Sequence, residues 1–317
     1  MASIGEGVEY SMALMSESLP LLFRFRSSPK QEEVDLPRPE LALWALLFYS
    51  VMLFVLNWGI RLFIVIPFLR HATLAWHGMP ATKTLIDKMA QSSMEFFFYL
   101  TFFVLGLIVV LPQPWLHPGS MWFAGGIKTH RFTRLLHFFY IAYGARYFQG
   151  FFSVLIEHRR KDFTEMLAHH FVSLALVIGS WQFGYIRIGA LIMLVFNPAD
   201  VPLQFAKVCK YFDPQSSFWM FMADRSFELF AVIFAVSRTG YYPYIVYSAF
   251  MQWPHSPQGG PEVFCLVFLS ILQLLNIFWL YLIVRVAVKK LVEGELEDVR
   301  SEDGSDAEAE AEAKKAK

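Results

Sequence analysis

The chain has 317 residues, of which 56% are hydrophobic and 17% aromatic, and its formal net charge is zero. Soluble domains are less apolar and carry more charge, so this composition indicates a membrane protein. Without a net positive charge the chain has no general attraction to polyanions, which argues against nucleic acid as a partner.

Seven apolar segments follow one another along the chain, most of them near the roughly 20 residues that a helix needs to cross a bilayer. They lie at 41–69, 96–111, 135–156, 163–181, 185–208, 217–236 and 263–288. In lipid every backbone polar group must be satisfied within its own segment, so these segments are expected to be helices. The sequence therefore predicts an all-α polytopic transmembrane bundle of about seven spans, or six if the short segments pair as re-entrant elements.

Basic residues gather in the connections that would lie on one side of a seven-span bundle. They are Arg70, Lys83, Lys88, Arg159, Arg160, Lys161, Lys207, Lys210, Lys289 and Lys290. The connections on the opposite side carry fewer, namely Lys128, Arg131, Arg134 and Arg238, although the N-terminal segment is also basic. Cytoplasmic loops are enriched in Lys and Arg, so we expect the C-terminus in the cytosol and the N-terminus in the lumen.

Four regions are expected along the chain. They are a polar or interfacial lumenal lead-in at 1–38, a first span with a cytosolic loop at 39–94, the main bundle at 95–290, and a disordered acidic cytosolic tail at 291–317. The tail ends in KKAK, in which Lys314 and Lys315 resemble the dilysine signal that returns membrane proteins to the endoplasmic reticulum. We therefore expect a multi-pass protein of that membrane.

Two of the predicted spans carry polar residues at intervals of three and four, which places them on one helix face. The first stripe consists of Asp162, Glu165 and His169, flanked by His170 and Ser173, and the second of Asn197, Asp200, Gln204 and Lys207. The connection between the two spans is short, so they are expected to be antiparallel neighbours. Ionisable residues inside a membrane usually face a partner or a wet cavity, so both stripes are predicted to meet in one cavity.

The adjacent His169 and His170, with Asp200 nearby, indicate acid–base or nucleophilic catalysis, because imidazole exchanges a proton near neutral pH and can attack an activated acyl group. Three other interpretations stay open: hydrogen bonds that only join helices, a metal site like that of membrane desaturases, and a proton-coupled transporter. The remaining histidines form no HxxxH or HxxHH box, which disfavours a metal. The sequence shows no inverted repeat, which disfavours a transporter.

Residues 159–212 resemble the signature region of the ceramide synthases, the longevity-assurance branch of the TLC-domain proteins. The matching residues are Arg159-Arg160-Lys161-Asp162-Phe163, Met166-Leu167, His169-His170, Arg187-Ile188-Gly189, Asp200, and Ala206-Lys207 with Tyr211. The resemblance covers roughly residues 95 to 290 and makes that region a TLC domain.

This resemblance implies transfer of a fatty acyl group from coenzyme A to a sphingoid base, forming ceramide or dihydroceramide, without a metal or other cofactor. It assigns catalysis to His169 and His170, either through an acyl-imidazole or by proton removal from the amine, with Asp200 and Asn197 as their expected partners. The residues expected to bind substrate are Arg159, Arg160, Lys161, Asp162, Arg187 and Lys207. Membrane lipids and a second subunit, in a homo- or heterodimer, are further expected partners.

One position departs from the family pattern. The family typically carries a His-Asp pair three residues before Asp200, where this chain has Phe196 and Asn197. An imidazole and a carboxylate are therefore missing, and Asn197 can orient a ring but cannot neutralise an imidazolium. The alternative function is a non-catalytic TLC-domain protein that binds lipid or assists membrane insertion.

Overall fold

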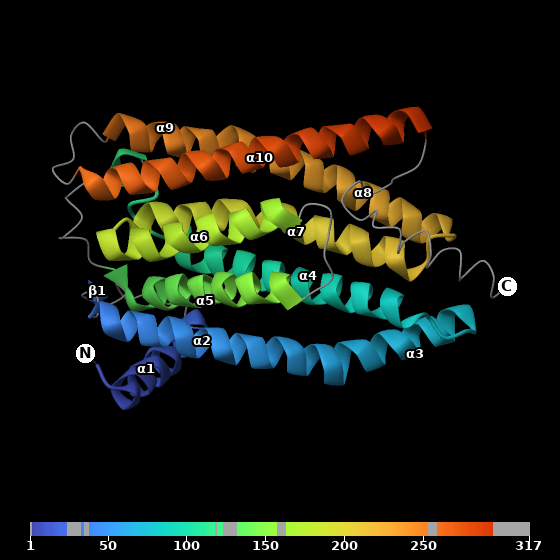
Figure 1. The fold of residues 1–317 in the computed structure, drawn as a ribbon, viewed down its shortest axis with the longest axis horizontal. Helices are drawn as coiled ribbons and strands as arrows, with labels where there is room; N and C mark the ends of the chain where they lie inside the picture. The colour runs from blue at the N-terminus through green and yellow to red at the C-terminus, as the bar shows by residue number, and fades with distance from the viewer. Residues whose placement is uncertain are drawn as a thin grey trace.

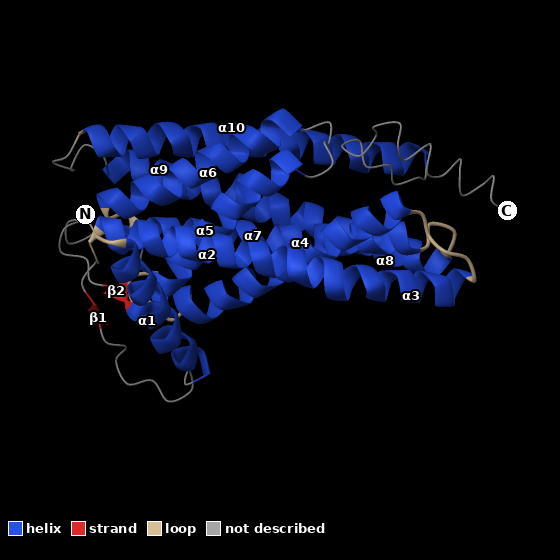
Figure 2. Ribbon diagram, turned by 60° about the horizontal axis from the view of Figure 1, so that its bottom comes forward, coloured by secondary structure: helices blue, strands red, loops and turns tan. Residues whose placement is uncertain are grey.

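The computed structural model describes residues 2–23, 33–34, 38–117, 119–122, 132–156, 163–252 and 259–293. These residues are almost entirely helical, which confirms the predicted all-α fold. Strand pairing within them is limited to an antiparallel pair of two residues each, β1 (Glu33–Val34) with β2 (Phe132–Thr133). Figure 2 shows this pair at the end of the bundle that also holds the N-terminus.

Besides the N-terminal helix α1 (Ile4–Phe23), the described residues form seven helical rods, and Figure 1 shows these rods running along the long axis of the bundle. In chain order they are α2–η2–α3 (Pro39–Ile60, Arg61–Val65, Ile66–His77), α4 (Lys83–Val110), α5 (Arg134–Ile156), α6 (Phe163–Phe183), α7 (Ile186–Phe212), α8–η5–α9 (Ser217–Phe234, Ala235–Tyr241, Tyr242–Gln252) and α10 (Gly260–Glu293). The η2 and η5 segments are π-helical turns inside longer helices. Helix α7 packs mainly between α4 and α8, whereas α6 packs on α5 and α10.

Five helices of the described chain are both long enough and apolar enough to cross a membrane. They are Pro39–His77, Lys83–Val110, Phe163–Phe183, Ile186–Phe212 and Gly260–Lys290. The predicted count of about seven spans is therefore not confirmed. The two remaining rods, α5 and α8–η5–α9, run beside the others and include polar residues such as Arg146, Gln149 and Arg238.

The outer faces of the rods are apolar, as a bilayer requires. Phe63, Phe68 and Leu274 are 82%, 66% and 66% exposed, respectively. Large apolar side chains in such numbers on a surface indicate contact with hydrocarbon rather than water. The polar residues described below face the opposite way, into the bundle.

A tight reversal connects the two helices that carry the predicted polar stripes. Gly184 has a φ of +81°, in the left-handed region that glycine adopts without strain, and it lies between the end of α6 and the start of α7. The predicted helices at 163–181 and 185–208 correspond closely to α6 and α7.

The N-terminal segment contains a helix that the sequence analysis did not predict. Helix α1 (Ile4–Phe23) packs against α2 and α5. The hydroxyl of Tyr10 lies 2.8 Å from Nε2 of His137, and the hydroxyl of Tyr49 donates to the backbone carbonyl of Ser11 at 2.8 Å.

The predicted boundary between the second and third regions of the chain, at residues 94 and 95, falls inside the continuous helix α4. Residues 294–317, including the predicted dilysine signal, lie outside the described residues.

The sequence analysis placed Arg238 in a connection between spans, and this placement is wrong. Helix α8 continues through the π-helical η5 into α9, so Arg238 lies inside a helical rod and is only 6% exposed. Single π-helical turns within longer helices often occur at functional sites. Here the turn directs a buried guanidinium toward α7.

Candidate functional site

Side chains from several helices of the bundle line a cavity with an empty volume of about 890 Å³, part of which is open to solvent. We call it the histidine cavity. Both predicted polar stripes contribute to its lining, with His169 and His170 from α6 and with Asn197, Asp200, Gln204 and Lys207 from α7. Much of the remaining wall is aromatic, from side chains such as Tyr99, Tyr147 and Trp279.

The two histidine rings are held by aromatic contacts. The ring of His169 meets that of Trp279 edge-on, with centroids 5.2 Å apart and planes at 82°, and lies 5.7 Å from the ring of His170. Tyr147 contacts both imidazoles. The Nδ1 atoms of His169 and His170 are buried and have no hydrogen-bond partner among the described residues. Buried polar atoms normally have partners, so each ring offers an unused nitrogen inside the bundle.

Asp200 is paired with Arg238 rather than with a histidine. The guanidinium of Arg238 forms an ion pair with the Asp200 carboxylate and donates from Nη2 to the backbone carbonyl of Phe196 at 2.8 Å. It also lies over the rings of Phe196 and Phe234, at 4.8 and 5.0 Å from their centroids. The expectation that Asp200 is a partner of the imidazoles stays a prediction. A carboxylate within a bilayer needs a cation nearby, so Asp200 itself indicated that a basic residue such as Arg238 would lie close to it.

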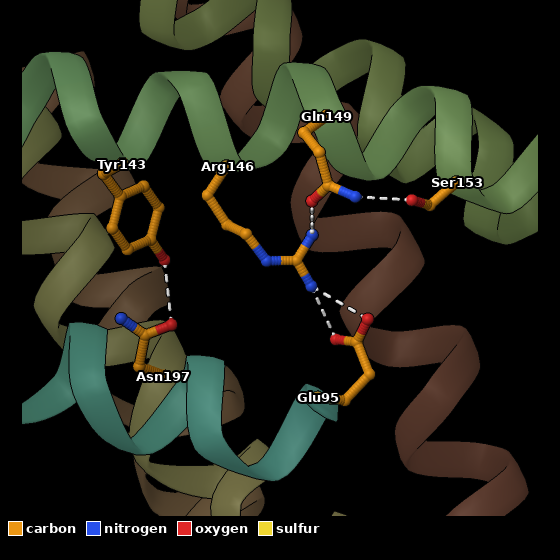
Figure 3. Close-up of polar contacts among 6 residues, drawn as sticks. All are labelled: Glu95, Tyr143, Arg146, Gln149, Ser153 and Asn197. Atoms are coloured by element: carbon orange, nitrogen blue, oxygen red, sulfur yellow. Dashed lines mark hydrogen bonds and ion pairs between the residues drawn. The ribbon is translucent and has the colours of Figure 1, made fainter. Parts of the chain in front are cut away.

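The departure at Phe196 and Asn197 has two different consequences. The Phe196 ring is buried against Tyr242, with centroids 4.9 Å apart, and it is absent from the described lining of the histidine cavity. Asn197 does line the cavity, and its Oδ1 accepts a hydrogen bond from the Tyr143 hydroxyl at 3.0 Å (Figure 3). The replacement of the family's imidazole by Phe196 therefore lies behind the described lining of the cavity. The replacement of the family's carboxylate by Asn197 changes a residue that lines it.

A second polar group, which the sequence analysis did not assign to the site, links α4 and α5 (Figure 3). Nη2 of Arg146 donates to both carboxylate oxygens of Glu95, at 2.8 and 2.7 Å, and Nη1 donates to Oε1 of Gln149 at 2.9 Å. Nε2 of Gln149 in turn donates to the Ser153 hydroxyl at 2.5 Å. The partners Glu95 and Arg146 are 51 residues apart, so helical spacing gave no sign of this pair.

This network lines a second cavity with an empty volume of about 610 Å³, which we call the side cavity. Glu95, Arg146 and Ser153 contribute polar groups to it. His170 lines the side cavity as well as the histidine cavity, whereas His169 is found only in the described lining of the latter. The His170 ring therefore stands at the junction of the two cavities.

A family model for the TLC domain matches residues 88–285, more than half of the chain. The chain belongs to the TLC-domain family. The match runs from α4 to α10 and includes every residue of the histidine cavity described above.

Curated relatives of this TLC-domain protein are named ceramide synthases. It is 32% identical to ceramide synthase 4 of Bos taurus over 71% of the chain and 58% of the relative, and 31% identical to ceramide synthase 5 of Homo sapiens over 72% and 56%. It is 27% identical to ceramide synthase hyl-2 of Caenorhabditis elegans over 68% of both. The resemblance found in the sequence is confirmed, although the chain spans less than two thirds of the first two relatives.

The residues predicted to bind substrate in this TLC-domain protein divide into three groups. Lys207 lines the histidine cavity. Arg187, in the first turn of α7, is absent from the described lining of both cavities and lies about 30 Å along the helix axis from Lys207. The expectation that both residues bind substrate stays a prediction. The others, Arg159, Arg160, Lys161 and Asp162, lie outside the described residues.

The site of the TLC-domain protein combines two unpartnered imidazole nitrogens with two partly buried ion pairs and an aromatic wall. Imidazoles in such a site can accept and return a proton or attack an acyl carbon. Among the described residues, no three His, Cys, Asp or Glu side chains come together as a possible metal site.

Proposed function

We propose that this protein transfers a fatty acyl group from acyl-coenzyme A to the amine of a sphingoid base, forming ceramide or dihydroceramide. The paired imidazoles of His169 and His170, each with an unused buried nitrogen at a cavity inside an apolar bundle, carry this proposal. The family membership and the names of the curated relatives support it. Acyl-coenzyme A is the co-substrate, and no other cofactor takes part.

The reaction needs one bond exchange and one proton transfer. The amine nitrogen attacks the thioester carbon, the C–N bond forms, and the C–S bond breaks. A histidine accepts the amine proton and returns it to the departing thiolate, so the imidazole ends the cycle unchanged. In the alternative route a histidine nitrogen first displaces the thiolate, and the amine then attacks the acyl-imidazole. Asp200 is paired with Arg238 in the lining of the cavity, and in this proposal it acts as a positioning residue and does not accept the proton.

The positions of two lysines suggest from which end of the bundle acyl-coenzyme A approaches the histidine cavity. Lys207 lines the histidine cavity near the end of α7 that connects to α8, and Lys210 follows one turn later. Lysines attract the phosphates of coenzyme A electrostatically. We assign this end of the bundle to the cytosol, which puts the C-terminus in the cytosol and residues 1–38 in the lumen of the endoplasmic reticulum. The region 95–290 acts as the TLC domain in membrane lipid, and dimerisation remains a prediction.

A non-catalytic lipid-binding role is the second candidate. Asn197 stands where the family typically has a carboxylate, and Asp200 is engaged by Arg238. Neither imidazole has a hydrogen bond to a carboxylate within the described chain, so the rings lack the acidic partner that often orients a catalytic histidine.

The test is product formation in membranes from cells that lack endogenous ceramide synthase activity. With isotope-labelled sphinganine and a series of acyl-coenzyme A donors, we expect labelled dihydroceramide that requires both substrates and this chain, measured by mass spectrometry. Control membranes contain the vector alone. A chain that is present at normal abundance but forms no amide with any donor would favour the lipid-binding role.

Gly150 offers a more local test, because it lies directly beside His170. A Cβ atom at position 150 would lie 2.9 Å from Nη1 of Arg146 and 3.0 Å from Cε1 of His170. Gly150→Ala is expected to lower the rate of amide formation by up to about 100-fold, because small displacements of a catalytic group are costly. Gly59→Ala is the control, since a Cβ there meets nothing within 4 Å. Equal rates for the two variants would contradict the placement of His170.

A further inference from the structure

We propose that the side cavity is the head-group subsite for the sphingoid base, with Glu95 and Ser153 as its recognition residues and His170 as the imidazole that meets the amine. This inference rests on the proposed function and extends it, because it assigns the two substrates to two different cavities. It depends on the charge of each cavity, on the position of His170 and on the hydrogen-bonding capacity of the network.

The two cavities differ in charge. In the described lining of the histidine cavity, Arg238 is paired with Asp200 and Arg146 with Glu95, and Lys207 is a further cation that the side cavity lacks in its described lining. The described lining of the side cavity contains one cation, Arg146, and one carboxylate, Glu95. An anionic coenzyme A thioester is attracted by an excess of positive charge, whereas a cationic amine is repelled by it. The histidine cavity therefore suits the donor, and the side cavity suits the amine.

The position of His170 brings the two substrates together. Its ring lines both cavities, so an amine in one and a thioester in the other can reach the same imidazole. His169 is found only in the described lining of the histidine cavity, where its ring meets that of Trp279 edge-on. The two adjacent histidines thus have different surroundings, although both belong to one turn of α6.

The network has hydrogen-bonding capacity left for a ligand. A carboxylate accepts about four hydrogen bonds, and Glu95 receives two from a single nitrogen of Arg146. The Ser153 hydroxyl accepts from Gln149 and keeps its own proton to donate. A sphingoid base is a long-chain amino diol, with an ammonium group and hydroxyls that match these two residues. The lining of the cavity also includes the apolar side chains of Val154, Phe163 and Met166.

The network is also fixed in position. The Arg146 guanidinium is held by Glu95 and Gln149 and lies over the ring of Phe98, at 4.7 Å from its centroid. A subsite built from such anchored groups loses little entropy when it binds a ligand. In the proposed sequence, Glu95 attracts the ammonium, one proton is lost to water, and the neutral amine attacks the thioester. His170 accepts the second amine proton, and the departing thiolate takes it up.

The experiment compares two acceptors in the assay described above: sphinganine and its analogue without the C1 hydroxyl. Ser153→Ala is expected to lower the preference for the diol, measured as the ratio of kcat/KM values, by about three- to tenfold, as the loss of one hydrogen bond would. Glu95→Gln is expected to raise the KM for both amines about tenfold or more while the KM for acyl-coenzyme A stays unchanged. Ser11→Ala is the matched control, because Ser11 is buried in α1 and its hydroxyl donates within its own helix.

The outcomes separate this inference from the proposed function. If wild type makes no amide, the proposed function fails. If wild type makes the amide but Ser153→Ala keeps the full preference for the diol, the subsite is wrong and the function stands. An increase in the KM for acyl-coenzyme A in Glu95→Gln would also overturn it, because that result would place the donor in the side cavity. Ser153→Ala breaks no ion pair, so it remains informative even if Glu95→Gln fails to fold.

Discussion

Replacement of His169 or His170 by alanine is expected to lower the rate of amide formation by about 10²- to 10⁴-fold, the usual contribution of a positioned acid–base group. Both rings lie inside the bundle, and their Nδ1 atoms have no partner among the described residues, so their loss breaks no hydrogen bond there. Protein abundance and thermal stability should therefore change much less than activity. The measurement is the initial rate of labelled dihydroceramide formation, normalised to the amount of each variant.

The matched control is His71→Ala, since His71 is exposed on α3 and lies outside the described lining of both cavities. If the two histidines act as a unit, the double variant should be little worse than either single one. Rates close to wild type in both single variants would rule out histidine catalysis and leave lipid binding as the better description.

Replacement of Arg238 by methionine is expected to lower the free energy of unfolding by about 3–5 kcal/mol, because it leaves the Asp200 carboxylate buried without its cation. The two side chains are 7% and 16% exposed. The double variant Asp200→Asn with Arg238→Met should recover much of this loss, since it removes both charges together. Unfolding can be followed in detergent, and a double-mutant cycle then isolates the coupling between the two residues.

Arg225→Met provides the comparison for this prediction. Arg225 also pairs with a carboxylate, Glu228, but the two side chains are 56% and 44% exposed. Exposed ion pairs contribute about 0–1 kcal/mol, so this variant should be nearly neutral. Equal destabilisation by Arg225→Met and Arg238→Met would show that the buried pair has no special importance.

Helices α6 and α7 could be predicted from the sequence because isolated polar residues at intervals of three and four stand out in an apolar segment. The same spacing indicated that both stripes share a cavity. Arg238 was missed for a local reason: Ser237, Thr239 and Gly240 precede Tyr241 in a segment that is typical of a loop. In the structure, Ser237 and Thr239 donate to the carbonyls of Ile233 and Ala235, each at 2.7 Å, and helical structure continues through the segment.

The side cavity could not have been predicted in this way. Its central ion pair joins Glu95 on α4 to Arg146 on α5, and no periodicity within one helix specifies which residues of another helix it will meet. The sequence also gave no means of distinguishing His169 from His170, because their different surroundings arise from contacts with α5 and α10.

The position of His170 at the junction of two cavities bears on how the proposed reaction cycle is organised. Substrates that occupied one common channel would have to enter and leave in turn, and a bound product would block its successor. In the proposed arrangement each substrate has its own cavity, so one can exchange with its surroundings while the other stays in place. By the route of direct amine attack, turnover would require both cavities to be filled at once, and neither substrate would have to bind first.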